Sequence, residues 1–231
     1  MAIIYGRADT EKRLLDKLPN RVQKIEDIPK VHREMKAELE SMDTGGFIGK
    51  IKGWNKKRQI NKITENRNSP LRRGVTGELK VLDVLSRLND DYHVFCGINI
   101  GLPYYVTYNG RKNLRSAQMD FVVVCPKGVF MIEVKNWSKG YGKRHDALNP
   151  HEQTDRAGRV LWIFLQSWRS KPRVTNVLLS TQGTFEYNKN YRAVFVSNLD
   201  RINNFIENRE ECYSEKHVKH IVGKLRHCVT K

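Results

Sequence analysis

Residues 119–137 read MDFVVVCPKGVFMIEVKNW, and this stretch decides how the middle of the chain folds. Two apolar runs, Met119–Cys125 and Val129–Lys135, flank the turn signal Pro126-Lys127-Gly128. Short runs rich in valine and isoleucine on either side of such a turn are typical of two paired strands. The sequence therefore predicts a buried antiparallel β-hairpin.

Three charged residues stand in these apolar strands: Asp120, Glu133 and Lys135. Burying a carboxylate without a partner costs several kcal/mol or shifts its pKa, so each charge needs a physical reason. Side chains alternate along a strand, which places Glu133 and Lys135 on the same face. Asp120 begins one strand and Glu133 ends the next, so both lie at one end of the hairpin. Two converging carboxylates favour a hard cation such as Mg²⁺ or Mn²⁺, which prefers oxygen ligands and keeps positions open for water and a substrate phosphate.

The lysine beside such a cation has two potential uses. Lys135 can hold the attacking water, or it can stabilise the charge that builds on the phosphate oxygens. The simpler alternative is a buried ion pair of Lys135 with Glu133 or Asp120. Such a pair leaves an extra carboxylate without a compensating charge, which favours the metal site.

A helix predicted over residues 76–88 brings a third carboxylate toward this place. Glu78 shares a helical stripe with Leu82 and Leu85, so it lies on or beside the buried face. Glu78 can join the site, or it can only be a partner for the dipole of the first helical turn.

A second helix is predicted from Asn149-Pro150 to about Trp168, with Asn149 as its cap. Gln153 lies in its first turn. Because helix N-termini attract phosphate, Gln153 and Arg156 are expected to contact the scissile or an adjacent phosphate. The alternative for Gln153 is a satisfied amide at the edge of the core.

The remaining elements complete an α/β plan with a mixed central sheet flanked by helices. Residues 64–70 read as a break, which divides the chain into a basic helical extension, 1–66, and an α/β domain, 67–231. Residues 101–116 are expected to be a long irregular connection. The other expected strands are 92–99, 175–179 and 192–196, with a last helix over about 214–227.

The chain has 231 residues, with 42 Lys and Arg against 25 Asp and Glu, a formal net charge of +17. Such an excess favours a polyanionic partner, and nucleic acid is the expected one. Basic residues beside Tyr104, Tyr105 and Tyr108 can grip a backbone while these rings stack on bases, although packing at the strand edge is an alternative use for the rings. The expected nucleic-acid contacts are Arg111, Lys112, Arg115, Arg156, Lys56, Lys57 and Arg58.

The extension contains a predicted basic amphipathic helix, 47–63, in which Phe47, Ile51 and Trp54 recur at helical spacing. Such a helix can lie on DNA, on a membrane surface or on its own domain. Docking on its own domain is the first expectation.

Several function classes are not expected. The longest uncharged run, residues 92–110, contains Pro103 and three glycines and cannot cross a bilayer as a helix. No phosphate-loop or helicase motif suggests ATP use. Four scattered cysteines and an early-charged N-terminus suggest a reduced cytoplasmic protein.

Several ordered blocks carry a resemblance to a known family. They are Gly74-x-x-Gly77-Glu78, Gln118-x-Asp120-Phe-Val-Val-Val, Gly128-Val-Phe-Met-Ile-Glu133-Val-Lys135-Asn136, and Asn149-Pro150 followed by Gln153. From residue 74 to 140 the chain resembles the nuclease-related domain (NERD) of the PD-(D/E)xK phosphodiesterase superfamily. The resemblance implies a restriction-endonuclease-like core.

It further implies that Asp120 and Glu133 are Mg²⁺ ligands and that Lys135 is the catalytic lysine, with supporting roles for Glu78 and Gln153. The backbone carbonyl of Val134 and the side chain of Glu78 are the further expected ligands. Position 157 is Ala, where many exonuclease relatives carry a tyrosine four residues after the glutamine, and this departure argues against an exonuclease; endonuclease is the expected class.

The sequence thus predicts a hydrolase, namely a metal-dependent nuclease with DNA as its expected substrate, and leaves open whether it accepts RNA and whether it prefers single or double strands. The cation would polarise the phosphodiester and lower the pKa of a water that Lys135 orients for in-line attack. The rival prediction is a non-cleaving nucleic-acid-binding or scaffold protein with the same fold. A homodimer is left open.

Overall fold

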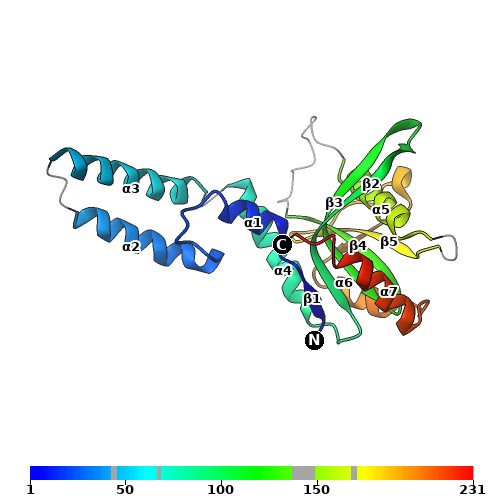
Figure 1. Cartoon of the computed structure of the whole chain (residues 1–231). Helices are drawn as coiled ribbons and strands as arrows, with labels where there is room; N and C mark the ends of the chain where they lie inside the picture. The colour runs from blue at the N-terminus through cyan, green and yellow to red at the C-terminus, as the bar shows by residue number, and fades with distance from the viewer. Residues whose placement is uncertain (43–45, 67–68, 137–148, 168–170, 231) are drawn as a thin grey trace. The chain divides into compact units, whose positions relative to one another are not determined.

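The computed structural model describes residues 1–42, 46–66, 69–136, 149–167 and 171–230 (Figure 1). The chain forms two compact units. One contains residues Met1–Asp9 and Thr76–Lys231, and the other contains Thr10–Val75. The first nine residues therefore belong with the larger unit, while the expected division at residue 66 stays a prediction.

A six-stranded mixed sheet forms the centre of the larger unit, and its strands follow one another in chain order. The first two strands pair in parallel, the next two pairings are antiparallel, and the last two are parallel again. The strands are β1 (Ile3–Tyr5), β2 (His93–Tyr108), β3 (Arg111–Cys125), β4 (Gly128–Lys135), β5 (Val174–Ser180) and β6 (Val194–Asn198). This architecture confirms the α/β class with a mixed central sheet and is consistent with a restriction-endonuclease-like core.

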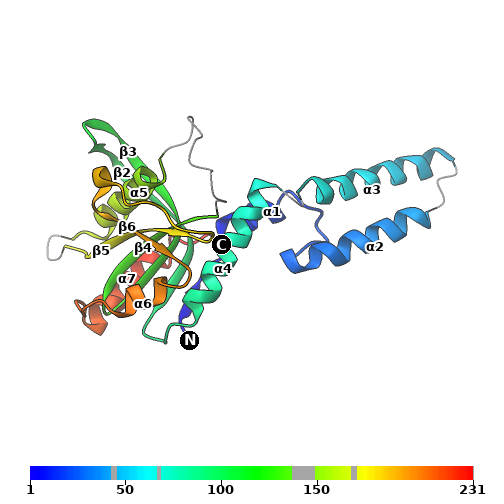
Figure 2. The same cartoon turned by 180° about the vertical axis from the view of Figure 1, so that it is seen from behind.

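Helices cover both faces of the sheet (Figures 1 and 2). On one face α4 (Pro70–Ser86) and α6 (Ile202–Glu207) pack on a core that includes Phe130 and Ile132 of β4. On the other face α5 (Pro150–Leu165) and α7 (Glu215–Leu225) pack on a core that includes Val129 and Met131. The alternation of β4 between two buried faces explains why its sequence is a continuous apolar run.

The expectation of an irregular connection over residues 101–116 is wrong. β2 and β3 continue as one long antiparallel hairpin and pair up to Tyr108↔Arg111. The strands are joined by Asn109 and Gly110, which have φ angles of 47° and 77°. An Asn-Gly pair with both residues at positive φ matches the twist of the flanking strands, so these two residues are a strong hairpin signal.

The helix expected over residues 76–88 begins earlier, at Pro70. Ser69 Oγ accepts a hydrogen bond of 3.1 Å from the backbone N–H of Arg72, and Pro70 occupies the first helical position. Ser-Pro is a common start signal for a helix, so the segment expected to be a break in fact contains a helix cap. Sequence reasoning also missed β1 and α6.

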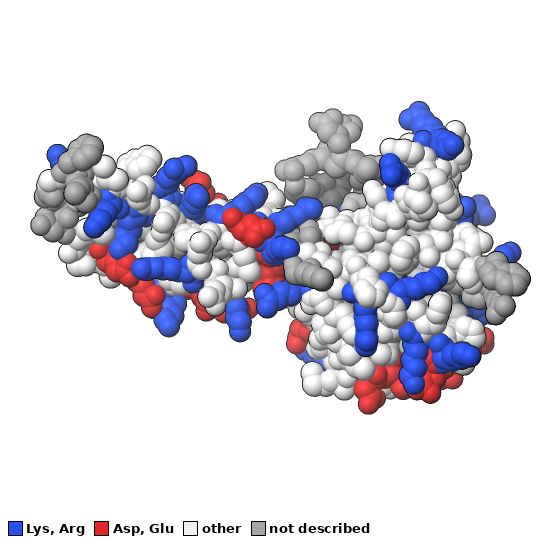
Figure 3. Space-filling model, in the orientation of Figure 1, with Lys and Arg blue, Asp and Glu red and all other residues white. Residues whose placement is uncertain are grey.

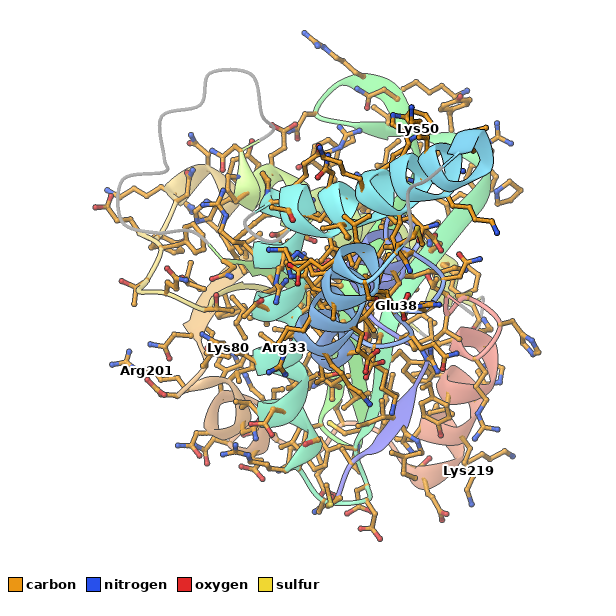
Figure 4. All side chains as sticks on the ribbon, turned by 90° about the vertical axis from the view of Figure 1, so that its left-hand side faces the viewer. Arg33, Glu38, Lys50, Lys80, Arg201 and Lys219 are labelled. Carbon is orange, nitrogen blue, oxygen red and sulfur yellow. The ribbon has the colours of Figure 1, made fainter. Side chains whose placement is uncertain are left out.

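The smaller unit is helical, with α1 (Asp9–Leu15) preceding α2 (Ile28–Glu40) and α3 (Gly46–Asn66). Its buried apolar residues include Val31 and Met35 of α2 and Ile60 and Ile63 of α3. Glu38 of α2, which Figure 4 labels, forms ion pairs with Arg21 at 2.9 Å and with Lys56 of α3 at 2.5 Å. Apolar packing and these charges together hold α2 against α3.

Two of the three residues of the predicted α3 stripe do not pack inside the helical unit, and the docking of α3 on the α/β domain stays a prediction. Ile51 and Trp54 are exposed to 44% and 63%, respectively, because α3 turns Ile60 and Ile63 inward instead. The side chain of Phe47 lies outside the described residues. None of the described helices is long and apolar enough to cross a membrane.

Candidate active site

The candidate site begins where the ladder between β3 and β4 ends. Phe121↔Ile132 is the last ladder pair at this end, and Asp120 and Glu133 are the next residues outward. The backbone N–H of Val134 donates a hydrogen bond of 2.7 Å to Asp120 Oδ2. The Asp120 side chain therefore reaches across to β4, as the hairpin prediction required.

A kink in the sheet lies at the same place. On the other side of β3, Gly97 of β2 stands opposite Asp120, and its φ is 59°. The flanking pairs are Cys96↔Phe121 and Ile98↔Met119. Cys96 and Phe121 pack on the face of the sheet that α4 covers, whereas Ile98 and Met119 pack on the face that α5 covers. Strict alternation of side chains along the strands would put both pairs on the same face. Asp120 therefore lies where β2 and β3 exchange faces, next to a glycine that can adopt the left-handed conformation.

Glu133 and Lys135 form an ion pair, with Lys135 Nζ 2.6 Å from Glu133 Oε1. Their side chains are exposed to 4% and 16%, respectively. The predicted placement on one strand face is therefore correct. The simpler alternative from the sequence, a Glu133–Lys135 pair, is also present in the structure, but it neutralises only one of the carboxylates at this end of the hairpin.

Glu78 of α4 is buried on the stripe that carries Val81 and Leu85 into the core. Gly77 lets α4 approach closely, because a Cβ at this position would lie 2.7 Å from Asn136 Cβ. Asn136 directly follows β4. A glycine just before the buried glutamate thus brings the middle of α4 to the end of β4.

The electrostatics of Asp120 link the three carboxylates. Burial raises the pKa of the Asp120 carboxyl well above its ordinary value, and the negative charges of Glu133 and Glu78 raise it further. The Val134 N–H and the charge of Lys135 act in the opposite direction. The charges of Glu133 and Glu78 therefore both disfavour an ionised Asp120, and the charge of Lys135 offsets this only in part.

The chemistry of these donors fits a hard divalent cation, since every candidate ligand is an oxygen. Within the ranges that the structure describes, however, no group of three or more His, Cys, Asp or Glu side chains is arranged to hold a metal ion. The site as it stands offers two carboxylates on adjacent strand positions, with the backbone carbonyl of Val134 between Glu133 and Lys135.

Asn136 is a positioning residue that sequence reasoning quoted only as part of the family resemblance. Its Oδ1 accepts a hydrogen bond of 2.7 Å from Thr181 Oγ1, and the N–H of Thr181 donates to the carbonyl oxygen of Lys135. These contacts tie the end of β4 to the end of β5. The sequence did contain a signal for this contact. Asn136 is a polar residue directly after Lys135, and the pair Ser180-Thr181 stands at the end of another expected strand.

The predicted start of α5 is confirmed. Asn149 Oδ1 accepts the backbone N–H of His151 at 2.9 Å, and Pro150 is the first helical residue. Gln153 is half-buried in this first turn, but no side-chain hydrogen bond joins it to Asp120 or Glu133 in the described part of the chain. The expected helix end at Trp168 lies outside the described residues, and α5 ends at Leu165.

The basic residues near α5 and the β2–β3 hairpin lie on one part of the larger unit. Arg156 stacks its guanidinium over the ring of Tyr108 at 5.0 Å, and Arg115 lies over Tyr105 at 5.4 Å. Arg111 and Lys112 are exposed at the hairpin tip. Figure 3 shows basic side chains at this tip, with no acidic side chain beside them on that face.

The basic residues of α3 differ in their availability. Lys57 and Arg58 are exposed, and Arg58 lies 5.8 Å from the ring centre of Trp54. Lys56 is held in its ion pair with Glu38, which reduces its value as a phosphate contact.

The sequence model of one protein family, the nuclease-related domain, matches residues 73–181 of the chain, from within α4 to the end of β5. This part of the chain is a nuclease-related domain. The match includes Glu78, Asp120, Glu133, Lys135 and Gln153, and the superfamily placement among PD-(D/E)xK phosphodiesterases is consistent with it. No curated protein and no solved structure is significantly similar to the chain.

Proposed function

We propose that this protein is a metal-dependent nuclease that hydrolyses phosphodiester bonds in DNA. The observation that carries the proposal is the position of Asp120 and Glu133 directly beyond the last ladder pair of β3 and β4, with Lys135 Nζ 2.6 Å from Glu133 Oε1 and the buried Glu78 close enough to raise the pKa of Asp120. Without a bound ligand, a cluster of buried carboxylates contributes no stability to the core. The nuclease-related domain gives the cluster a chemical purpose.

Asp120 and Glu133 would hold Mg²⁺ or Mn²⁺, with the backbone carbonyl of Val134 and the side chain of Glu78 as further ligands. Bound there, the cation supplies polarisation of the phosphodiester and a lowered pKa for the attacking water. The positive charge of the cation would also offset the repulsion of Asp120 by Glu133 and Glu78.

Lys135 has the position of a catalytic lysine. Its Nζ is 2.6 Å from Glu133 Oε1 and is partly exposed, so it can also donate hydrogen bonds to water or to a phosphate oxygen. In this role Lys135 orients the attacking water for in-line displacement and stabilises negative charge on the phosphate. Gln153 and Arg156, in the first two turns of α5, would contact an adjacent phosphate.

The basic residues supply affinity without reading sequence. The contacts at the hairpin and on α5 are Arg111, Lys112, Arg115 and Arg156, and those on α3 are Lys56, Lys57 and Arg58. The preference for DNA over RNA, endonucleolytic cutting and a cytoplasmic location are parts of the same proposal, and a homodimer is compatible with it.

A plasmid-nicking assay tests the proposal. Supercoiled DNA is expected to be nicked in Mg²⁺ or Mn²⁺ but not in EDTA, and Asp120→Asn is expected to stop the reaction. Glu215→Gln is the matched control, since Glu215 forms a surface ion pair with Lys219 on α7. Nicking by Asp120→Asn at the wild-type rate would refute the site, and DNA binding without any nicking would establish the non-cleaving alternative.

A further inference from the structure

The outer part of the β2–β3 hairpin forms a distinct surface, called here the hairpin arm, residues 101–116. One side of the arm packs inward through Leu102, Tyr108 and Leu114, which are buried in the core under α5. Tyr108 OH donates a hydrogen bond of 2.7 Å to Asp155 Oδ2 of α5. The arm is therefore held against α5 along one side, and its other side faces solvent.

The ladder of the arm is interrupted by a large bulge. Gly101 pairs with Ser116, but the next pair is Val106↔Leu114. Four residues of β2, 102–105, therefore stand opposite the single residue Arg115. Bulges re-aim side chains and recur next to functional sites.

This bulge exposes two adjacent aromatic rings. Tyr104 is 59% exposed and Tyr105 is 51% exposed. Arg115 approaches Tyr105 with its guanidinium 5.4 Å from the ring centre, while its Nε donates to the carbonyl oxygen of Leu102. A cation and a ring face are thus fixed together on the solvent side.

The charge of the arm is of one sign. Residues 92–119, which include all of β2 and the arm, contain no Asp or Glu, whereas the arm carries Arg111, Lys112 and Arg115. Lys112 pairs with Thr107 in the ladder, and both residues are exposed. The arm itself combines exposed rings and positive charge and contains no carboxylate of its own, which complements a polyanion.

The arm leads to the candidate site along the same strand. Asp120 follows Arg115 by five residues of β3, about 17 Å of extended chain. Because β4 runs antiparallel to β3, its end with Glu133 and Lys135 points back toward the arm. At the spacing of about 3.4 Å per nucleotide in stacked DNA this distance corresponds to about five nucleotides, and an extended single strand covers it with fewer.

We propose that the hairpin arm binds unpaired nucleotides, with Tyr104 and Tyr105 stacking on bases and Arg111, Lys112 and Arg115 contacting phosphates. In a duplex the faces of the bases are already stacked, so exposed rings gain their stacking only on a single strand. The inference rests on the proposed nuclease function and specifies its substrate as single-stranded DNA or the unpaired part of a larger structure.

The test measures binding in EDTA, so that cleavage plays no part. Fluorescence anisotropy compares a labelled oligothymidylate of about 20 nucleotides, long enough for one binding site, with the duplex that it forms with its complement. The full-length Tyr104→Ala/Tyr105→Ala variant is expected to bind the oligothymidylate at least about tenfold more weakly, with the duplex changed less than about twofold. The matched control is Tyr187→Ala, which removes a ring that is 60% exposed outside the arm.

Two further results distinguish stacking from other effects. Tyr104→Phe/Tyr105→Phe keeps both rings and is expected to bind like the wild type. Equal losses for single strand and duplex, or unchanged binding of the alanine variant, would overturn the proposal. A third result would also overturn it: weaker binding of the alanine variant to vesicles that contain phosphatidylserine, with its binding of the oligothymidylate unchanged. These binding measurements need no metal, whereas the nicking assay reports on the proposed metal ligands Asp120 and Glu133. A failure of the stacking proposal can therefore be distinguished from a failure of the proposed nuclease function.

Discussion

The backbone N–H of Val134 donates to Asp120 Oδ2 at 2.7 Å, directly beyond the last ladder pair between β3 and β4. The carboxyl of Asp120 thus holds the two strands together at the point where main-chain pairing stops. The same carboxyl is a proposed metal ligand. Substitutions at this position separate the two roles only if they keep an acceptor for the Val134 N–H.

Asp120→Asn keeps an acceptor oxygen, and Glu133→Gln keeps the shape of its side chain. Either change is expected to lower nicking by more than about a hundredfold, because even the partners that support metal ligands contribute up to that factor. Asp120→Ala should lose activity and in addition about 1–3 kcal/mol of stability, since it leaves the Val134 N–H without its acceptor. Circular dichroism checks the fold, and near-normal nicking by either isosteric variant would contradict the metal site.

The raised pKa of Asp120 predicts a dependence of stability on pH. The folded protein binds this proton more tightly than the unfolded chain, so the contribution is fully present below the ordinary pKa of an aspartate and is lost as pH rises through the raised value. In EDTA the melting temperature of the wild type should therefore fall over this window more than that of Asp120→Asn. Mg²⁺ should restore it in the wild type only, and parallel melting curves for the two proteins would contradict the prediction.

Lys135→Ala should reduce turnover far more than DNA affinity. Lys135 is one of 42 Lys and Arg residues, so its loss should change the dissociation constant less than about twofold while lowering the rate at saturating DNA more than about a hundredfold. Equal losses of rate and affinity would instead make Lys135 a phosphate clamp. Binding is measured in EDTA and rate in Mg²⁺.

Gly77→Ala tests the approach of α4 to the end of β4. The added methyl would lie 2.7 Å from Asn136 Cβ, so α4 has to shift, and Glu78 shifts with it. We expect about 1–3 kcal/mol of destabilisation and a loss of activity. Gly223→Ala on α7 is the control, because its methyl meets no atom within 4 Å and should leave activity unchanged. Wild-type activity of Gly77→Ala would show that the position of Glu78 is immaterial.

The exposed basic residues of α3 predict salt-dependent affinity. Lys57→Gln/Arg58→Gln should weaken DNA binding and lower the slope of log affinity against log salt by up to about 1.8, since each phosphate that is no longer neutralised lowers it by about 0.9. Lys30→Gln/Lys36→Gln on α2 is the matched control. α2 carries as many acidic as basic residues, whereas α3 has six basic residues, including Lys50 in Figure 4, and one acidic residue. Identical slopes for all three proteins would show that α3 does not bind DNA.

The parts of the fold that the sequence predicted are those with strong local patterns. The hairpin around Pro126 and Gly128 follows from two apolar runs and a turn, and the start of α5 from Asn149-Pro150. The closeness of Asp120 and Glu133 then follows from strand alternation alone. In each case the signal lies within a few residues.

The missed features depend on contacts between distant residues or on turn chemistry that was overlooked. β1 has three residues, too few for any periodicity, and is recognised only through its pairing with His93–Phe95. The close approach at Gly77 involves Asn136, and no local pattern reveals it. The hairpin arm, by contrast, was readable from Asn109-Gly110. The exposure of Trp54 depends on which face of α3 packs on α2, and the equally apolar Ile60 and Ile63 occupy that face.

The position of β1 in the chain has a consequence for synthesis. Ile3 pairs with His93, so 90 residues must follow before this strand meets its partner. At the usual rate of translation the delay is about 5 to 18 seconds, long enough for the helical segment between them to fold first. β1 therefore stays unpaired while the helical segment is made, and premature capture of residues 3–5 by another chain would leave the edge of β2 open.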